Sequence, residues 1–348
     1  MITARKTNRG TALACLAVAA LTTLDLVAAT SATASPTPAA PHRASSIVFI
    51  SDRDSPSPDQ LTDEVYLYDT AAGHTSRLTT NDVAEAFPVL SPDGRYLAYL
   101  SNTGISVCPL SFAAGSWSCG PARGVVSDPA PGNGGRFVWT PDGRSIVYGG
   151  TDPVGGDVDI FSVNLFNLKS ARNLTQEASG EPAAFDGAPT VSPDGHYVVY
   201  AHAGDLYRRR IDGTQPVALT STPTTEFAPA YSPDGSKIAF HSNRPGTFDI
   251  YVMQPRPEST ENPVVDLTSE VIAPDGSASH ERYPTWSPDG AEIAFWWYVI
   301  PPGLDDGEIY TIRADGTGIE NLTANNPTDP AAQAVGDITP AWGTARRH

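Results

Sequence analysis

The chain has 348 residues, 39 of them acidic and 22 basic, which gives a formal net charge of −17 at pH 7. This acidic balance argues against binding to nucleic acid or to an anionic membrane, and favours solubility, cationic partners or divalent ions. The length alone would suit two or three domains.

The first 34 residues have the pattern of an export signal. Three basic residues within the first nine positions precede an apolar run over 11–24, and small residues at 32–34 offer a cleavage site. The apolar run is too short to span a bilayer, and no later stretch is long or apolar enough. Residues 35–45 are rich in Pro and Ala and predict a flexible spacer. We therefore expect a secreted or envelope-associated protein with no membrane span.

One tetrapeptide, Ser/Thr-Pro-Asp-Gly, recurs along the rest of the chain. Five copies follow one another at intervals of 49, 52, 40 and 55 residues, and they begin at Ser91, Thr140, Ser192, Ser232 and Ser287. A strand–turn–strand unit at such a period is typical of a propeller blade.

The fourth copy shows the anatomy of one repeat. Short β segments are predicted over 228–231, 237–240, 249–253 and 265–268, and turn residues separate them. The Ser-Pro-Asp-Gly turn at 232–235 joins the first two, with Pro setting φ, Asp accepting from backbone N–H groups and Gly supplying a positive φ. We name these strands A to D, from the axis outwards.

Strand A carries a proline in five copies, at Pro88, Pro189, Pro229, Pro284 and Pro340. Because proline donates no ladder hydrogen bond, it belongs on a sheet edge, which places strand A at the inner edge of the blade. Large residues before each turn are predicted to fill the space between blades, namely Leu90, Trp139, Val191, Tyr231, Trp286 and Trp342.

The two ends of the chain are predicted to share one blade. Residues 47–50, 65–68 and 78–79 have the pattern of strands B, C and D without a strand A before them. Residues 338–342 form a strand A with nothing after it. Together with the five full copies they predict an all-β, six-bladed propeller over residues 46–345.

The repeat resembles the WD40-like repeat of TolB-type propellers. The resemblance rests on the unit x-Pro-x-Trp-Ser-Pro-Asp-Gly, followed by Ile-Ala-Phe, Asp-Ile-Tyr-Val-Met and Leu-Thr, and it covers residues 46–342. It implies protein–protein contact through a disc face and no nucleotide or redox cofactor. TolB carries an α/β domain before its propeller, and some similar peptidases carry an α/β-hydrolase domain after it; neither is expected here.

Two cysteines remain once the signal is removed. In an oxidising compartment Cys108 and Cys119 are expected to pair and to bridge a hairpin inside the second blade.

Acidic residues mark the entry to two strands of most blades. The inner set precedes the strand A proline by three positions and comprises Glu85, Asp186, Glu226, Glu281 and Asp337. The outer set opens strand C and comprises Glu64, Asp159, Asp205, Asp249 and Glu308. In one interpretation each carboxylate accepts hydrogen bonds that hold its own loop. In the other, the inner set converges on the channel mouth and binds calcium or a Lys/Arg segment of an envelope protein.

An aromatic run, Trp296-Trp297-Tyr298, is expected on the loop between strands B and C of the last full blade. Exposed there, it would anchor a protein or a glycan. The alternative is that one of these rings covers the neighbouring blade.

Signatures of catalysis are missing from the sequence. It has no Gly-x-Ser-x-Gly, no phosphate-binding glycine loop and no Cys-x-x-Cys. Asp152, Asp157 and Asp159 cluster like a calcium loop, but their spacing fits no defined pattern.

We therefore expect a monomeric, non-enzymatic binding scaffold without a resident cofactor. The alternative is an enzyme, because propellers that resemble this one include polysaccharide lyases that use channel histidines and a divalent metal. His202, His241 and His280 would then be the ligands, and they would have to meet at one point with an open coordination position.

Overall fold

The structure is a computed structural model that describes residues 45–54, 63–81, 83–127, 136–154, 156–176, 185–269, 271, 278–299, 307–323 and 336–346. All of them belong to one compact unit, Pro41–His348. The predicted signal peptide, and the predicted spacer up to Ser45, lie outside the described residues.

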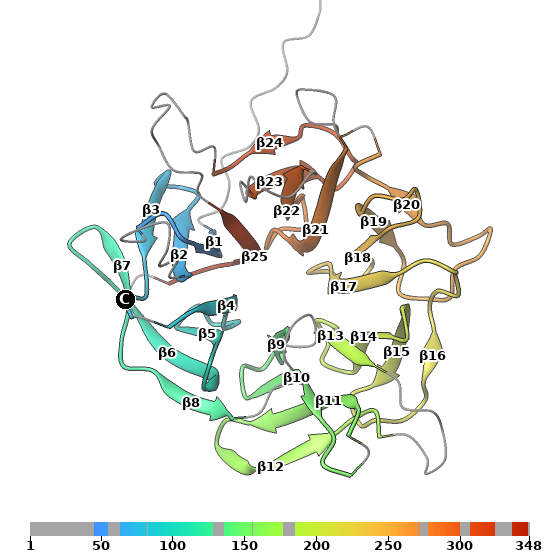
Figure 1. The fold of residues 1–348 in the computed structure, drawn as a ribbon, viewed down its shortest axis with the longest axis horizontal. Helices are drawn as coiled ribbons and strands as arrows, with labels where there is room; N and C mark the ends of the chain where they lie inside the picture. Colours follow the sequence, from blue (N-terminus) through green and yellow to red (C-terminus); the bar gives the residue numbers. More distant parts are fainter. Residues whose placement is uncertain are drawn as a thin grey trace, which may run out of the picture. The chain divides into compact units, whose positions relative to one another are not determined.

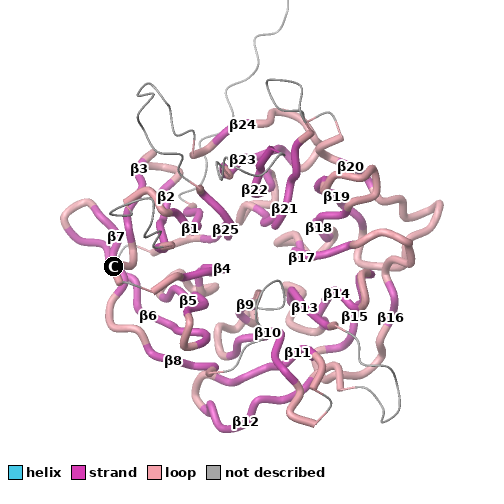
Figure 2. The backbone as a smooth tube through the Cα atoms, viewed as in Figure 1, coloured by secondary structure: helices cyan, strands magenta, loops and turns pink. Residues whose placement is uncertain are grey.

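The described residues form six antiparallel sheets around a common axis, and none of them is helical (Figures 1 and 2). Each sheet is one blade, and the strand order within it runs outwards from the axis, as predicted. The predicted six-bladed, all-β fold is therefore confirmed.

The first three blades contain the following strands. Blade 1 consists of β25 (Asp337–Gly343), β1 (Ser46–Ser51), β2 (Glu64–Asp69) and β3 (His74–Arg77). Blade 2 consists of β4 (Glu85–Leu90), β5 (Tyr96–Ser101), β6 (Gly104–Ala113), β7 (Ser116–Cys119) and β8 (Arg123–Val126). Blade 3 consists of β9 (Phe137–Trp139), β10 (Ser145–Thr151), β11 (Val158–Asn164) and β12 (Asn167–Asn173).

The other three blades follow in chain order around the ring. Blade 4 consists of β13 (Asp186–Val191), β14 (Tyr197–His202), β15 (Asp205–Arg210) and β16 (Val217–Ala218). Blade 5 consists of β17 (Glu226–Tyr231), β18 (Ile238–Ser242), β19 (Asp249–Met253) and β20 (Val265–Asp266). Blade 6 consists of β21 (Ser279–Trp286), β22 (Glu292–Val299), β23 (Glu308–Arg313) and β24 (Glu320–Asn321).

The ring closes through blade 1, which joins both ends of the propeller. The last strand, β25, pairs antiparallel with β1, so that Ile47 lies opposite Trp342 and Val48 opposite Ala341. All six residues of β1 are buried. Closure thereby removes the free edge that β1 would otherwise present.

A β-bulge interrupts the innermost strand of five blades at the same place. The register between strands A and B shifts at the proline, and the residue before each proline has a φ between 49° and 56°. These residues are Phe87, Ala188, Ala228, Tyr283 and Thr339. A bulge accommodates a residue that cannot donate to the ladder, and positive φ at a non-glycine residue is conformationally costly.

Large side chains before the turns pack between neighbouring blades, as predicted. The Trp139 indole of blade 3 donates to the Val89 carbonyl of blade 2 at 3.3 Å. The Trp286 indole of blade 6 donates to the Ala230 carbonyl of blade 5 at 3.0 Å. Both rings are buried, so each joins two blades by packing and by one hydrogen bond.

The Ser-Pro-Asp-Gly turns have the conformation that their residues favour. In blade 5 the Ser232 hydroxyl donates to the Asp234 carboxylate at 2.6 Å and accepts from the Lys237 N–H at 2.9 Å. Gly235 has a φ of 72°. These turns lie at one face of the ring, which we call the turn face; strands A begin at the opposite face, which we call the acid face.

The predicted disulfide between Cys108 and Cys119 is present. It joins β6 to β7, a hairpin that extends from blade 2 beside the regular fourth strand, β8.

Candidate functional site

All five inner acids are buried at the acid face. The exposed fractions of Glu85, Asp186, Glu226, Glu281 and Asp337 lie between 0 and 3%. Buried carboxylates need hydrogen bonds or counter-charges, so their partners decide what these groups can still bind.

Three of the inner acids have a basic side chain beside them, an arginine in two blades and a histidine in the third. Arg53 donates two hydrogen bonds to Asp337, at 2.8 and 2.9 Å. Arg244 lies 3.4 Å from Glu226. Each arginine lies two residues beyond the strand B residue that faces the acid, Ser51 or Ser242.

In blade 4 the basic side chain is that of a histidine, His202. Nδ1 of His202 lies 2.6 Å from the Asp186 carboxylate, and these residues face each other across β13 and β14. Burial raises the pKa of Asp186, and the contact with His202 opposes that rise.

The remaining two inner acids have no cation at the matching position, which Thr103 occupies in blade 2 and Val299 in blade 6. Glu85 instead accepts hydrogen bonds from Thr79 and Asn81, at 2.5 and 2.8 Å. Burial raises its pKa.

Glu281 is the least satisfied of the set. It is fully buried, and neither carboxyl oxygen accepts a hydrogen bond of normal geometry in the described part of the chain. Burial, and then the neighbouring Asp249 carboxylate, raise the pKa of Glu281 well above its usual range. Because two buried carboxylates in contact cannot both ionise cheaply, this pair retains a proton at neutral pH.

A row of threonines that the sequence analysis missed organises the acid face. In five blades the threonine after the fourth strand accepts, at 2.8–3.0 Å, the N–H of the residue that follows the outer acid. These threonines are Thr79, Thr175, Thr220, Thr268 and Thr323. The recurrent Leu-Thr pair was the available signal for them.

Four of these hydroxyl groups also lie within hydrogen-bond distance of an acid. The pairs are Thr79–Glu85, Thr175–Asp159, Thr220–Asp205 and Thr323–Glu308, at 2.5–3.3 Å. These four acids are thus engaged between strands or between neighbouring blades. Calcium or a cationic segment at the inner set stays a prediction, and it would have to compete with these partners.

Blade 2 lacks an outer acid for a steric reason. Gly104 stands at that position with a φ of +112°, and a Cβ there would lie 1.9 Å from the Val126 carbonyl oxygen. No side chain can occupy this position without moving β8.

Residues from distant blades meet on the axis. The Tyr283 ring of blade 6 lies 6.0 Å from the Phe87 ring of blade 2, although blade 1 separates these blades. The Arg136 guanidinium of blade 3 lies 5.1 Å from the same Tyr283 ring. Side chains therefore fill the axis at this level, and the sequence analysis had singled out neither Arg136 nor Tyr283.

His241 and Trp296 complete this central cluster, which we define as Phe87, Arg136, His241, Tyr283 and Trp296. The His241 ring lies 5.4 Å from Tyr283, and its Nδ1 accepts the Tyr283 N–H at 3.3 Å. The Trp296 ring stacks on Tyr283 at 6.0 Å. Burial, and then the charges of Arg282 and Arg136, hold the pKa of His241 well below its usual range, so its imidazole is neutral.

The predicted position of Trp296, Trp297 and Tyr298 is wrong, because they lie within strand β22 and not on a loop. The strand continues past the Ile-Ala-Phe segment, and alternation sends the rings to two faces. Trp297 is 9% exposed and packs on Tyr310, while Trp296 and Tyr298 stack on each other at 4.3 Å. Their role as an anchor stays a prediction.

The three histidines of the enzyme alternative have separate partners. His202 contacts Asp186, and His241 contacts Tyr283. Nδ1 of His280 accepts the Phe248 N–H at 2.9 Å. No metal-ligating group of three forms around any of them within the described ranges. The common meeting point that the metal-dependent alternative requires is therefore absent from this part of the chain.

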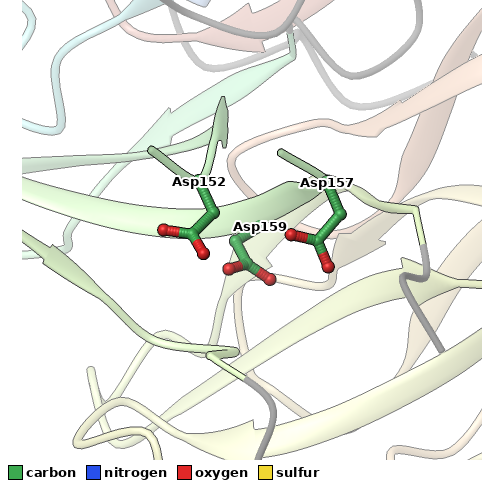
Figure 3. Close-up of side chains that lie close together, drawn as sticks. All are labelled: Asp152, Asp157 and Asp159. Atoms are coloured by element: carbon green, nitrogen blue, oxygen red, sulfur yellow. The ribbon is translucent and has the colours of Figure 1, made fainter. Parts of the chain in front are cut away.

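Three carboxylates of blade 3 do lie together. One oxygen each of Asp152, Asp157 and Asp159 falls within a mutual distance of 4.8 Å (Figure 3). Asn173 and Thr175 hydrogen-bond to the Asp159 carboxylate. Burial, and then its two acidic neighbours, raise the pKa of Asp159. Acidic groups cluster in many proteins without an ion, and no further donor here points to a metal.

A cavity of about 360 Å³ lies on the axis between the central cluster and the turn face. Phe87, Arg136 and Thr339 line its deep end. Its walls are the strand A prolines of five blades, Pro88, Pro189, Pro229, Pro284 and Pro340. Pro92 and Pro288 of the turns line its outer end. The cavity thus extends from the bulges to the turn face.

Comparison with family models found no match. An uncharacterized protein of Agrobacterium fabrum is 28% identical over 169 residues, 46% of this chain and 53% of that protein. An uncharacterized peptidase of Bacillus subtilis is 26% identical over 56% of this chain and 28% of the peptidase. The Tol-Pal system protein TolB of Anaeromyxobacter dehalogenans is 32% identical over 40% of this chain and 26% of TolB. The chain spans about half the length of the first of these proteins and less of the others.

Solved structures give the same fold. TolB of Acinetobacter baumannii superposes with a TM-score of 0.60 at 17% identity, over 86% of this chain and 67% of that one. A TolB homologue of Agrobacterium tumefaciens gives 0.56 at 23% identity, over 80% and 88%. An oligogalacturonate lyase of Vibrio parahaemolyticus gives 0.50 at 16% identity, over 79% and 73%. The propeller is TolB-like in fold.

None of the described residues belongs to a helix that could cross a bilayer.

Proposed function

We propose that this protein is an extracytoplasmic, non-enzymatic scaffold that binds a protein of the cell envelope through its turn face. The observation that carries the proposal is the axial cavity, which extends to the turn face while the central cluster fills the axis beneath it. Four of the five inner acids at the acid face already contact other side chains of the protein, and the fifth, Glu281, is fully buried, which favours the turn face as the binding surface.

Two observations support the location and the class. The Cys108–Cys119 disulfide suits an oxidising compartment, in agreement with the export pattern of residues 1–34. TolB, among the similar proteins, is a component of the Tol-Pal system. The similar proteins also include a peptidase and a lyase. Because similar propellers thus occur in enzymes, the lack of catalytic activity is itself part of the proposal.

The binding face can be tested by capture from a native envelope extract, with the mature chain as bait. Pro92→Arg and Pro288→Arg place a large charged side chain at the outer end of the cavity, since both prolines are exposed and line it. Asn102→Arg is the matched control, because Asn102 is exposed next to β5 at the acid face. We expect the two turn-face variants to lose a partner that the wild type and Asn102→Arg retain.

Two outcomes would contradict the proposal. If Asn102→Arg alone lost the partner, binding would use the acid face. If the wild type captured no specific partner after cross-linking, the scaffold role itself would fail.

A further inference from the structure

The deep end of the axial cavity contains two polar atoms that form no hydrogen bond with the described part of the chain. Nη1 of Arg136 is buried and has no hydrogen bond to any residue that the structure describes. Within the same residues, Oγ1 of Thr339, which is 8% exposed, has none either. Both residues line the same cavity, and they come from blades 3 and 1. Both groups can donate a hydrogen bond.

Arg136 differs from the three arginines that pair with buried acids at the acid face. Arg53 contacts Asp337, Arg77 contacts Glu64, and Arg244 contacts Glu226 and Glu258. Arg136 has the Tyr283 ring as its neighbour, in a cation–π contact. Arg282 also lies over aromatic rings, those of Phe248 and Tyr298, but among these two arginines only Arg136 lines the cavity.

The charge of Arg136 persists at neutral pH. Burial lowers its pKa to about 10, which still leaves the guanidinium group protonated. Nearby His241 is neutral and contributes no competing charge. An anion that enters the cavity would therefore find one fixed positive charge at its deep end.

The shape of the cavity restricts what the anion can belong to. A volume of about 360 Å³ accommodates a ligand the size of a few residues but not a folded domain. The five proline walls supply apolar surface and no N–H donors at those positions. The cavity ends at Phe87, Arg136 and Thr339, so a chain that enters from the turn face would stop there.

We propose that the axial cavity binds a carboxylate of an extended peptide segment, with Arg136 as the charged donor and Thr339 as a second donor. This inference rests on the proposed function, because it identifies the chemical group of the partner that the cavity at the turn face binds. The carboxylate is either a chain terminus or an acidic side chain, and guanidinium recognises both in the same planar geometry.

Calorimetric titration of the purified mature chain with three tetrapeptides tests the proposal. The probes are tetra-alanine with a free carboxylate, the same peptide amidated, and an acetylated, amidated Ala-Glu-Ala-Ala. We expect at least one carboxylate peptide to bind and the amidated tetra-alanine not to bind. Binding to the first indicates a chain terminus, and binding to the third indicates an acidic side chain.

Variants then assign the donors. Arg136→Gln should weaken the binding of the carboxylate peptide by about tenfold or more, and Thr339→Val by about threefold, because hydrogen bonds from charged donors are the stronger ones. Arg144→Gln is the matched control, since Arg144 is an exposed arginine of the same blade at the turn face. Near-ultraviolet circular dichroism of each variant verifies the fold.

Three results would overturn the inference. They are equal binding of the carboxylate and amidated forms, unchanged affinity of a folded Arg136→Gln, and no binding of either carboxylate peptide up to about 10 mM. Envelope capture distinguishes this from failure of the scaffold role. If Arg136→Gln retains the partner, only the carboxylate site is refuted. If neither the wild type nor any variant captures a partner, the scaffold role is refuted, and the peptide titration alone decides whether the carboxylate site exists.

Discussion

The five inner acids, which stand at the entry of strand A, differ in whether a basic side chain lies beside the carboxyl group. Asp337 and Glu226 have an arginine and Asp186 has a histidine, each supplied by strand B or by the loop directly after it. Glu281 has none and keeps its proton, because burial and Asp249 disfavour a second charge. The same motif position therefore gives charged groups in some blades and a neutral group in another.

Replacing Glu281 by Gln should make the protein more stable at alkaline pH. The folded-state pKa of Glu281 is raised, so above the unfolded pKa the unfolded chain releases a proton that the folded protein retains. Stability of the wild type then falls as pH rises towards the folded pKa, and Gln removes this contribution. We expect similar melting temperatures at about pH 5 and a higher one for the variant at about pH 8. Glu320→Gln, at an exposed glutamate, should show no such divergence.

Removing the charge of Asp337, in contrast, should make the protein less stable. Asp337→Asn leaves Nη2 of Arg53 without the carboxylate to which it donates and should cost roughly 2–4 kcal/mol in urea unfolding. A second variant, Arg53→Met, and the double variant complete a cycle. The double variant should recover part of the loss, and strict additivity of the two single effects would refute the pairing.

Among the elements, the inner strand and the β6–β7 hairpin depart from regular blade structure. Bulges in β4, β13, β17, β21 and β25 take the prolines out of the ladder, which leaves the strand edge along the axis apolar. The hairpin extends beyond the blade and is joined to it by Cys108–Cys119. Outside the hairpin ladder itself, few contacts hold β7 apart from Trp117 and the hydrogen bonds of Ser116 and Trp117 to Ser76.

Loss of the disulfide should therefore loosen the hairpin before the ring. The cysteines are 11 residues apart, and closing a loop of this size stabilises by roughly 2–3 kcal/mol. Hydrogen exchange of Cys108→Ser/Cys119→Ser should show lost protection over 104–119 and unchanged protection in blades 4 and 5. Uniform loss over all blades would indicate that the bridge stabilises the whole ring instead.

At the scale of the whole molecule, ring closure decides stability. β25 contributes the innermost strand of blade 1, and both β1 and the inter-blade packing of Trp342 depend on it. The ring also brings blades 2, 3 and 6 together at Tyr283. The central cluster therefore forms only when the ring is closed.

A chain that ends at residue 336 should fail to form the monomeric ring. It lacks β25, so the six buried residues of β1 become a free edge, which favours aggregation. Light scattering after gel filtration should show large oligomers, or the chain should be insoluble. A chain that ends at residue 346 retains β25 and serves as the control. A monodisperse 1–336 chain with the melting temperature of the wild type would disprove the role of closure.

Local signals determined much of this protein. The five Ser/Thr-Pro-Asp-Gly turns, the strand A prolines, the divided blade and the cysteine pair all act over a few residues, or through simple edge chemistry, and all are confirmed. Trp296 to Tyr298 were misplaced because an apolar strand end and an apolar loop look alike in sequence. The inner and outer acids were correctly located at strand entries. The sequence, however, shows only that a carboxylate is present and not which side chain contacts it.

The axis, in contrast, was decided by tertiary structure. Arg136, Tyr283 and Phe87 are far apart in the chain. Each stands directly before the strand A proline or, in blade 3, before Phe137 at the same place, but the repeat does not show that these side chains meet, and closure of the ring brings them together. Whether a charge has a partner depends on which side chains other blades direct towards it. Repeat chemistry is short-range and can be inferred from a linear pattern. The cavity, and the contact of Arg136 with the Tyr283 ring at its deep end, result from side-chain packing across the full circumference.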